Sequence, residues 1–191
     1  MKNILTLIIM VVCFTTSCAN AQTGNTTNEP KNEKILITYF SKTGNTKKLA
    51  EQIQSLTGGN LVQIETEREY PQEYKAATET AKLEKETNAR PVLKTKIDNM
   101  NEYDVIFIGF PIWWSYTPMV IATFLESYDF SGKTIIPFCT HGGGGVGEAF
   151  NYVTKLTPNS IHSEGFITYG SSASAAKPDI EKWLKNSNII K

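Results

Sequence analysis

The sequence predicts an α/β fold: a doubly wound, five-stranded parallel sheet with helices on both faces. Two patterns support this prediction. Segments with the apolar runs of buried strands alternate with segments whose apolar residues recur at helical spacing. The strand segments are also apolar almost throughout, as expected when helices cover both faces of a parallel sheet. Alternation of this kind is typical of right-handed strand–helix–strand crossovers.

The first half of the chain is predicted to hold two strands and two helices. Residues 34–40 (KILITYF) form a near-continuous apolar strand, and 60–66 (NLVQIET) form the second. Between them, the stretch 45–59 is predicted as a helix that ends at Gly58 and Gly59, because its apolar residues recur at helical spacing. Residues 70–88 are predicted as a polar helix with a small apolar face made of Tyr74, Ala77 and Ala81.

The alternation continues into the second half of the chain. Residues 103–110 (YDVIFIGF) and 133–140 (KTIIPFCT) are predicted as the third and fourth strands. Between them, 117–128 is predicted as a helix, with Thr117 as its N-cap and Pro118 at its first helical position.

Three more elements complete the predicted domain. Residues 146–156 are predicted as a helix and 160–170 (SIHSEGFITYG) as the fifth strand. Residues 178–186 are predicted as a closing helix that turns three apolar side chains inward: Ile180, Trp183 and Leu184. A chain of 191 residues is long enough to bury a sizeable core, and we expect one folded domain over residues 34–191.

Composition argues against some classes of partner. The 19 basic residues balance the 19 acidic ones, so the chain has no nucleic-acid footprint and we expect no nucleic-acid partner. No metal site is predicted. Cys139 is the only cysteine of the predicted domain, and we expect it to be a small buried packing residue.

Residues 1–18 have the layout of an export signal: a short charged start (MKN), an apolar run (ILTLIIMVVCF) and a small polar end (TTSC). The apolar run is too short to span a bilayer as a stable anchor. Cys18 stands where a bacterial lipoprotein signal places its lipidated cysteine, and the polar residues 19–33 indicate a flexible tether. We therefore expect export to the periplasm or cell envelope, with a lipid anchor at Cys18. The alternative is cleavage near Ala19 or Ala21 and release as a soluble protein.

The stretch SKTGNT, residues 41–46, follows the first predicted strand and leads into the first helix. In a doubly wound sheet, ligands bind outside the carboxyl ends of the strands. The N–H groups at a helix N-terminus lack partners and attract anions, and the hydroxyl and amide side chains add donors. The stretch therefore predicts a cradle for a phosphate dianion, without the glycine patterns of triphosphate or dinucleotide sites. The alternative is an ordinary Ser/Thr-rich turn that caps the helix.

Two further loops are predicted at the same edge of the sheet. Residues 111–118 (PIWWSYTP) place three large aromatic side chains after the third strand, and exposed tryptophans are costly unless something flat covers them. Residues 140–148 (THGGGGVGE) follow the fourth strand, and four consecutive glycines allow backbone N–H groups to approach a planar ligand closely. A phosphate cradle, an aromatic wall and a glycine-rich edge together predict a site for flavin mononucleotide (FMN).

These three loops, in this order and spacing, resemble the flavin-binding loops of the flavodoxin family. The resemblance covers nearly everything from Lys34 to the C-terminus. It implies FMN as the cofactor and a flavodoxin-like strand order of 2-1-3-4-5. By position, it also implies three sets of cofactor-binding residues: Ser41, Lys42, Thr43, Gly44, Asn45 and Thr46 in the phosphate loop, Pro111, Ile112, Trp113 and Trp114 beside the ring, and Thr140, His141, Gly142, Gly143 and Gly144 at its pyrimidine edge.

His141 is the only histidine expected near the ring. It could supply a proton to a reduced flavin or compensate its charge, which makes it the one candidate catalytic residue. The alternative is a solvated loop histidine with no such role. The sequence does not tell which of the two tryptophans stacks on the ring.

Three functions follow as alternatives. The first is an FMN-containing electron-transfer protein of the cell envelope, which passes electrons between redox partner proteins. The second is an FMN-dependent reductase that transfers electrons from NAD(P)H to a quinone-like acceptor. The third, from a different class, is a non-catalytic module whose cleft binds another phosphate ligand.

Overall fold

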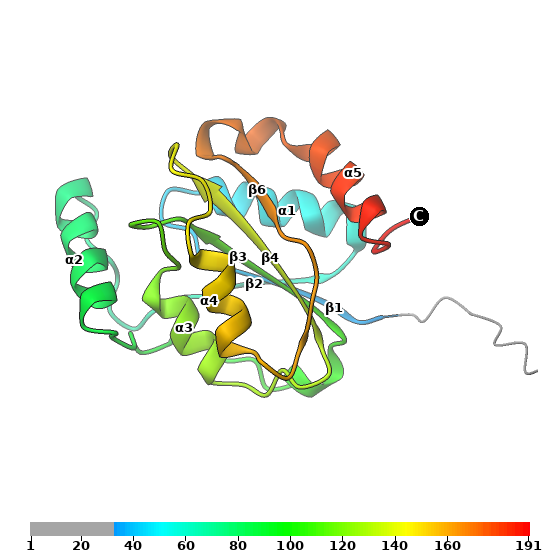
Figure 1. Ribbon diagram of the computed structural model, residues 1–191, viewed down its shortest axis with the longest axis horizontal. Helices are drawn as coiled ribbons and strands as arrows, with labels where there is room; N and C mark the ends of the chain where they lie inside the picture. The colour runs from blue at the N-terminus through cyan, green and yellow to red at the C-terminus, as the bar shows by residue number, and fades with distance from the viewer. Residues whose placement is uncertain (1–32) are drawn as a thin grey trace, which may run out of the picture. The chain divides into compact units, whose positions relative to one another are not determined.

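The computed structural model describes residues 33–191, which form a parallel β-sheet with helices on both faces (Figure 1). The predicted export signal, the lipidation site Cys18 and nearly all of the predicted tether lie outside the described residues. Within residues 33–191, no helix is long and apolar enough to span a bilayer. The elements are β1 Ile35–Tyr39, α1 Asn45–Thr57, β2 Asn60–Gln63, α2 Tyr74–Glu86, η1 Met100–Glu102, β3 Val105–Pro111, α3 Met119–Glu126, β4 Thr134–His141, α4 Ala149–Leu156, β5 Ile161–His162, β6 Phe166–Tyr169, η2 Gly170–Ala175 and α5 Lys177–Asn186.

The strand order confirms the predicted fold class. The strands lie in the order β2-β1-β3-β4-β5. Strand β6 also pairs with β4, at the carboxyl end of that strand. In register, Ile37 of β1 lies between Leu61 of β2 and Phe107 of β3, and all three strands are parallel. The chain moves outward from β1 to β2 and then returns past β1 to β3. The strand order therefore reverses beside β1, and a crevice for a ligand is expected there, outside the carboxyl ends of the strands.

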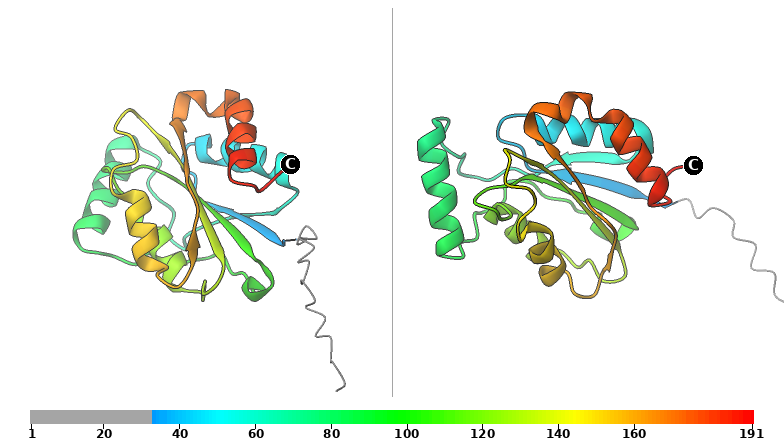
Figure 2. Two further views of the ribbon diagram at one scale, coloured as in Figure 1. Left: turned by 45° about the vertical axis from the view of Figure 1, so that its right-hand side comes forward. Right: turned by 45° about the horizontal axis from the view of Figure 1, so that its top comes forward.

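Two hydrophobic clusters form the core, one on each face of the sheet. Figure 2 shows α1 and α5 on one side of the strands and α3 and α4 on the other. Successive residues of β3 alternate between the faces, as the two-residue period of a strand requires. Val105 and Phe107 join the cluster that contains Leu49, Ile53, Ile180, Trp183 and Leu184. The other cluster contains Ile106, Ile108, Phe110, Val120, Phe124 and Val153.

The fifth predicted strand, 160–170, consists of two short strands, β5 and β6, which pair with the two ends of β4. Pro137 lies opposite the gap between them. The Ile135 carbonyl accepts from the Ser163 N–H and so faces this edge of β4, and Pro137, two residues further, faces the same way. Proline has no N–H to donate, so the ladder cannot continue through this position. The prediction of one continuous strand was therefore wrong.

Helix α2 stands apart from the other helices, beyond one end of the sheet (Figure 1). It begins at Tyr74 because the Glu73 carboxylate accepts two N–H groups of its first turn, which shortens the predicted helix 70–88. Ala77 and Ala81 are buried, as predicted. Tyr74 is 81% exposed, so its predicted place on the buried face was wrong.

The start of α3 also differs from the prediction. The helix begins at Met119, and Pro118 rather than Thr117 is its N-cap. The Thr117 hydroxyl is buried and donates to the Ala149 carbonyl at the start of α4, at 3.0 Å. This tertiary hydrogen bond between two neighbouring helices takes the place of the predicted capping bond.

Candidate functional site

A cleft of about 850 Å³ opens at the carboxyl edge of the sheet. Its walls come from the loops that follow β1, β3, β4 and β6, and from α2. The predicted site residues that line it are Lys42, Thr43, Asn45, Pro111, Ile112, Trp113, Trp114, Thr140, His141 and Gly142. The others occupy neighbouring positions in the same loops: Ser41, Gly44, Thr46, Gly143 and Gly144. The structure therefore brings the three predicted loops together.

The loop between β1 and α1 has the features of an anion site. Gly44 has φ +84° just before α1, and no side chain among the described residues caps this helix. The first N–H groups of α1 can therefore donate to a ligand. In the same loop, the Ser41 Oγ is buried and has no hydrogen-bond partner among the described residues. A buried hydroxyl without a partner is costly, so this loop fits a ligand oxygen that would accept its hydrogen bond.

The lysine of this loop points toward α2. Lys42 Nζ lies 3.5 Å from Gln72 Oε1, in the segment that leads into α2. Lys42 is also the only charged side chain among the described residues that line the cleft. The cleft is therefore mildly basic, which favours an anionic ligand over a cationic one.

Close contacts join the loops to one another. The Thr46 and Thr140 hydroxyls are both buried and lie 3.0 Å apart, which connects the first turn of α1 to the end of β4. Gly170, after β6, lies against the first residue of α1: a Cβ on Gly170 would be 2.9 Å from Asn45 Nδ2. A side chain at this position would displace the Asn45 side-chain amide. The rim of the cleft is thus held in place from two sides.

The loop after β3 makes a tight two-residue turn. Trp113 N–H donates to the Tyr116 carbonyl at 3.0 Å, and Tyr116 N–H donates to the Trp113 carbonyl at 2.9 Å. Trp114 and Ser115 between them have φ of 53° and 55°, values that such turns usually assign to glycine or asparagine. Since the loop has no glycine, its backbone is strained beside the cleft. Gly147 packs so closely behind the turn that an added Cβ would overlap the Ser115 carbonyl oxygen.

The two tryptophans have different environments. Trp113 is half-buried and packs edge-on against Phe40 and Tyr70, with ring centroids 5.3 and 5.1 Å away. Trp114 is 49% exposed, and its Nε1–H donates to the Thr78 carbonyl of α2 at 2.9 Å. Trp113 therefore forms a fixed part of the wall, whereas Trp114 fastens α2 to the rim.

A tyrosine–glutamate pair gives α2 a second attachment to the domain. Tyr70 OH donates to Glu84 Oε2 at 2.8 Å. Burial, followed by the nearby Glu84 charge, raises the Tyr70 pKa far above its usual value. Burial also raises the pKa of Glu84, and the hydrogen bond from Tyr70 opposes this shift. The Glu84 carboxyl group therefore lies in surroundings that disfavour its charged form.

His141 lies at the end of β4 and lines the cleft. Its ring packs against that of Tyr169, with centroids 4.4 Å apart. Its Nδ1 accepts hydrogen bonds from the N–H groups of Gly143, at 3.0 Å, and Gly145, at 3.4 Å. The residue therefore contacts both the glycine-rich loop and the loop after β6.

Cys139 is fully buried beneath the cleft, next to Thr140 in β4. Burial raises the pKa of its thiol to about 12. Its predicted role as a small buried packing residue is confirmed. Among residues 33–191, no group of three or more His, Cys, Asp or Glu side chains is arranged to hold a metal ion.

Two parts of the cleft were missed by the sequence reasoning. One is the α2 wall, formed by Gln72, Tyr74, Ala77, Thr78 and Ala81, and the other is the loop after β6, formed by Tyr169, Gly170 and Ser171. The second carried a usable signal, because TYGSSAS places a glycine and serines after a strand, as in the loop after β1. The first had none, since a helix of mixed polarity is typical of an exposed surface.

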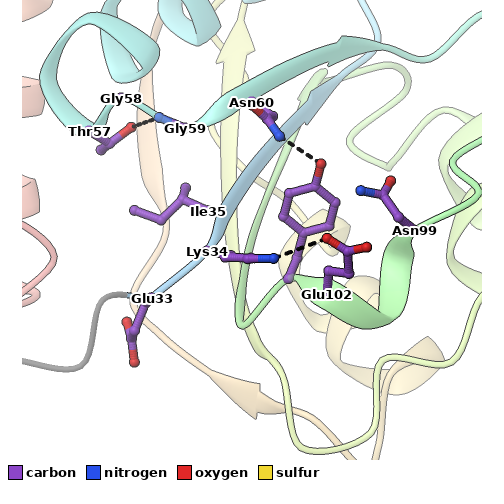
Figure 3. A pocket seen from close by; sticks show the side chains of 10 residues that line it. Glu33, Lys34, Ile35, Thr57, Gly58, Gly59, Asn60, Asn99 and Glu102 are labelled. Carbon is purple, nitrogen blue, oxygen red and sulfur yellow. Dashed lines mark hydrogen bonds and ion pairs between the residues drawn. The ribbon is translucent and has the colours of Figure 1, made fainter.

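A smaller pocket of about 340 Å³ lies at the opposite edge of the sheet, where β1 and β2 begin (Figure 3). Lys34 Nζ lies 3.0 Å from Glu102 Oε2, and Asn60 Nδ2 donates to Tyr103 OH at 2.8 Å. None of the predicted site residues lines this pocket. Two pairs of its polar side chains are thus joined by hydrogen bonds, whereas the buried Ser41 hydroxyl beside the cleft has no partner among the described residues.

Comparisons with solved structures found flavoproteins. A protein of Bacteroides eggerthii described as a candidate flavoprotein shares 34% identity, covers 82% of this chain and 99% of its own, and has a TM-score of 0.69. A similarly described protein of Bacteroides uniformis shares 33% identity over 81% and 99% of the two chains, with a TM-score of 0.72. A flavoprotein of Lactobacillus acidophilus, solved in complex with FMN, shares 22% identity over 79% and 98%, with a TM-score of 0.65.

None of the curated proteins compared with the chain matches it significantly. The sequence model of the flavodoxin family, however, matches residues 34–187, nearly the whole predicted domain. This match agrees with the strand order and with the extent of the first structural likeness. The chain therefore belongs to the flavodoxin family.

Proposed function

We propose that this protein binds FMN in the cleft and transfers electrons through it. The observation that carries the proposal is the loop after β1, where a buried Ser41 hydroxyl without a partner lies beside the uncapped N-terminus of α1. Bound FMN supplies the redox chemistry, because its ring takes up and releases electrons. The residues of this chain bind and orient it.

The phosphate of FMN is assigned to the loop between β1 and α1. The N–H groups of the first turn of α1 and the Ser41 hydroxyl provide donors that have no partner among the described residues. No Asp or Glu lines the described cleft, so no carboxylate repels a dianion there. The Thr46–Thr140 contact holds the first turn of α1 in place before the ligand arrives.

The ring of FMN is assigned to the space between the aromatic turn and the glycine-rich loop. Trp113 is immobilised by its aromatic neighbours and can form one wall at little further cost in entropy. Gly142 brings backbone to the opposite rim. The Lactobacillus acidophilus flavoprotein, which shares this fold, was solved with FMN, which supports the choice of flavin over another flat anion.

Titration of the purified protein with FMN and with riboflavin tests this proposal. The two ligands share the ring and differ in the phosphate. We expect FMN to bind at least about 100-fold more tightly, since several charge-assisted hydrogen bonds depend on the phosphate. Equal affinities would overturn the phosphate assignment. If neither flavin binds but another phosphate ester does, the protein is a phosphate-ligand binding module instead.

One observation favours the reductase as a second candidate. Tyr74 lines the cleft from α2 yet remains 81% exposed, so an aromatic surface is available to a second flat molecule. In such a reaction NAD(P)H would lose a hydride, and a quinone would gain two electrons and two protons, one proton from the hydride and one from solvent. NAD(P)H oxidation measured with and without an added quinone tests this candidate. A rate of NAD(P)H oxidation that needs both FMN and quinone supports the reductase. If NAD(P)H is not oxidised, electron transfer between proteins is the function that remains.

The location in the cell envelope is also a proposal, supported by the sequence of residues 1–33. Labelling with a radioactive fatty acid, followed by membrane fractionation, tests the anchor. The wild-type chain should carry label and sediment with membranes, and Cys18→Ser should do neither. An unlabelled, released wild-type chain would indicate the alternative cleavage near Ala19 or Ala21.

A further inference from the structure

The glycine-rich loop after β4 has an acceptor at its centre. His141 Nδ1 accepts from Gly143 N–H at 3.0 Å and from Gly145 N–H at 3.4 Å. A ring nitrogen that accepts carries no proton, so the histidine in this arrangement is neutral and its proton is on Nε2. The loop therefore selects one tautomer of the imidazole.

Packing holds only the far end of this loop, where Val146 lies against the core and Gly147 against Ser115. At the preceding glycines, an added Cβ on Gly142, Gly143, Gly144 or Gly145 would meet no heavy atom within 4 Å, so no neighbouring group packs on that side of them. Gly143 and Gly145 have φ of 135° and 69°, which are open to glycine and rarely to other residues. Because glycine has the largest conformational freedom to lose, such a loop needs a specific restraint. The hydrogen bonds to His141 are that restraint on its cleft side.

We propose that His141 is a positioning residue: its neutral Nδ1 orders the glycine-rich loop for the cofactor, and its protonation releases the loop. This inference rests on the proposed function, since FMN is the ligand whose binding it controls. The imidazolium form has no acceptor, so Gly143 and Gly145 would each lose their partner. His141 thus acts through the loop backbone, in place of the proton-donating role weighed from the sequence.

Few ionisable side chains lie near His141 among the described residues. Tyr169 of β6 packs against the ring, and across the cleft the titratable lining residues are Lys42 and Tyr74. Residues 142–147 carry no charged side chain. No carboxylate among the described residues lines this cleft. No ion pair from a lining carboxylate would therefore replace the two hydrogen bonds that a protonated His141 loses. Loop order, and with it FMN affinity, should therefore fall as the pH is lowered through the range in which histidine titrates.

Three variants separate the acceptor from the rest of the side chain. His141→Asn places an amide oxygen near the position of Nδ1 and does not titrate. His141→Gln reaches toward Nε2 instead, and His141→Ala removes both. We expect His141→Asn to retain FMN affinity within about threefold of wild type at about pH 8, and the other two to lose about tenfold, the effect of one lost hydrogen bond.

The pH dependence gives the decisive contrast. Between about pH 8 and about pH 5, the range in which histidine changes charge, FMN affinity of the wild type should fall about tenfold more than that of His141→Asn. A merely structural role would leave the two profiles parallel, and parallel profiles would overturn the proposal.

A second measurement does not depend on FMN. Nitrogen-15 NMR of the full apoprotein reports which ring nitrogen carries the proton, and amide exchange reports protection of the Gly143 N–H. We expect the Nε2–H tautomer in the wild type, and protection of Gly143 that is lost in His141→Ala and kept in His141→Asn. An Nδ1–H tautomer would overturn the inference. If the NMR results agree while no variant binds FMN, the proposed function fails and the ordering role of His141 remains.

Discussion

The two edges of the sheet are built from the same strands but differ in how their polar groups are paired. At the amino edge, Lys34 pairs with Glu102 and Asn60 with Tyr103 around a small pocket (Figure 3). At the carboxyl edge, the Ser41 hydroxyl is buried without a partner and α1 begins without a side-chain cap, among the described residues. The donors of these two pairs are occupied at the amino edge, whereas Ser41 and the start of α1 have donors available at the carboxyl edge.

The backbone shows the same contrast. At the amino edge, Gly58 has φ +73° as the C-cap of α1, a usual position for glycine. At the carboxyl edge, Trp114 and Ser115 have positive φ without being glycine. Strain and unpaired donors persist only where the surrounding structure enforces them, and they commonly mark functional sites. The difference indicates that one edge is arranged for stability and the other for a ligand.

The largest difference between the edges is expected for glycine substitutions. Gly147→Ala would force a Cβ into the Ser115 carbonyl at a positive φ, so we expect a loss of about 3 kcal/mol in unfolding free energy. FMN affinity should fall at least about tenfold because the aromatic turn loses its support. Gly58→Ala has a similar φ but open space, and should cost only about 1 kcal/mol, with FMN affinity unchanged. Urea unfolding and FMN titration measure both, and equal losses would contradict the contrast.

The second prediction is that removing a single hydroxyl stabilises the apoprotein and weakens FMN binding. Ser41→Ala removes a buried group that has no partner among the described residues, so the apoprotein should gain about 1 kcal/mol. The same change should weaken FMN binding by roughly 10- to 100-fold, through loss of a charge-assisted hydrogen bond. As the amino-edge control, Asn60→Ala loses its bond to Tyr103 and should cost about 1 kcal/mol without affecting FMN. A destabilised Ser41→Ala apoprotein would show that the hydroxyl is already paired.

A smaller effect is expected from relieving strain in the aromatic turn. Ser115→Gly removes the penalty of a positive φ, so thermal or urea unfolding should show a gain of about 0.5–1 kcal/mol. Asn188 is a matched control, because it has φ 57° outside the cleft and asparagine tolerates that conformation. Asn188→Gly should change stability little. A gain at Asn188 as large as that at Ser115 would mean that the strain is not specific to the cleft.

The smallest predicted effect concerns pH and the attachment of α2. Burial raises the pKa of Glu84, so the folded protein holds this proton more tightly than the unfolded chain does. The contribution of Glu84 to stability is therefore complete below the unfolded pKa of about 4.3 and is lost as pH rises through the folded pKa. Glu84→Gln keeps an oxygen for Tyr70 and removes this dependence. Unfolding measured across pH should show a change within about 1 kcal/mol, and a wild-type stability that rises over this window relative to Glu84→Gln would contradict the assignment.

The sequence predicted the fold class and the meeting of three loops, because these follow from local pattern and from the topology of parallel sheets. The strand order was implied by the resemblance to the flavodoxin family. Apolar runs such as that of β3 identify buried strands directly, and the carboxyl ends of parallel strands must share one edge. The clustering of Thr43, Trp114 and His141 around one cleft follows from that rule.

The rest depended on tertiary contacts that have no local signal. Thr117 was predicted to cap α3, but its hydroxyl bonds to Ala149, thirty-two positions away. The α2 wall could not be recognised because Thr78 contributes its backbone carbonyl, which the sequence does not distinguish, to the Trp114 indole. The ordering role proposed for His141 depends on the direction of one ring nitrogen relative to the loop.

The interruption opposite Pro137 affects how the molecule behaves at high concentration. An exposed, continuous edge strand offers unpaired N–H and C=O groups to the edge of another chain and so invites aggregation. Here the outer edge beside β4 is divided into strands of two and four residues, Ile161–His162 and Phe166–Tyr169. Neither is long enough to template an extended intermolecular sheet, so a proline that interrupts pairing within the fold also protects it from pairing with its neighbours.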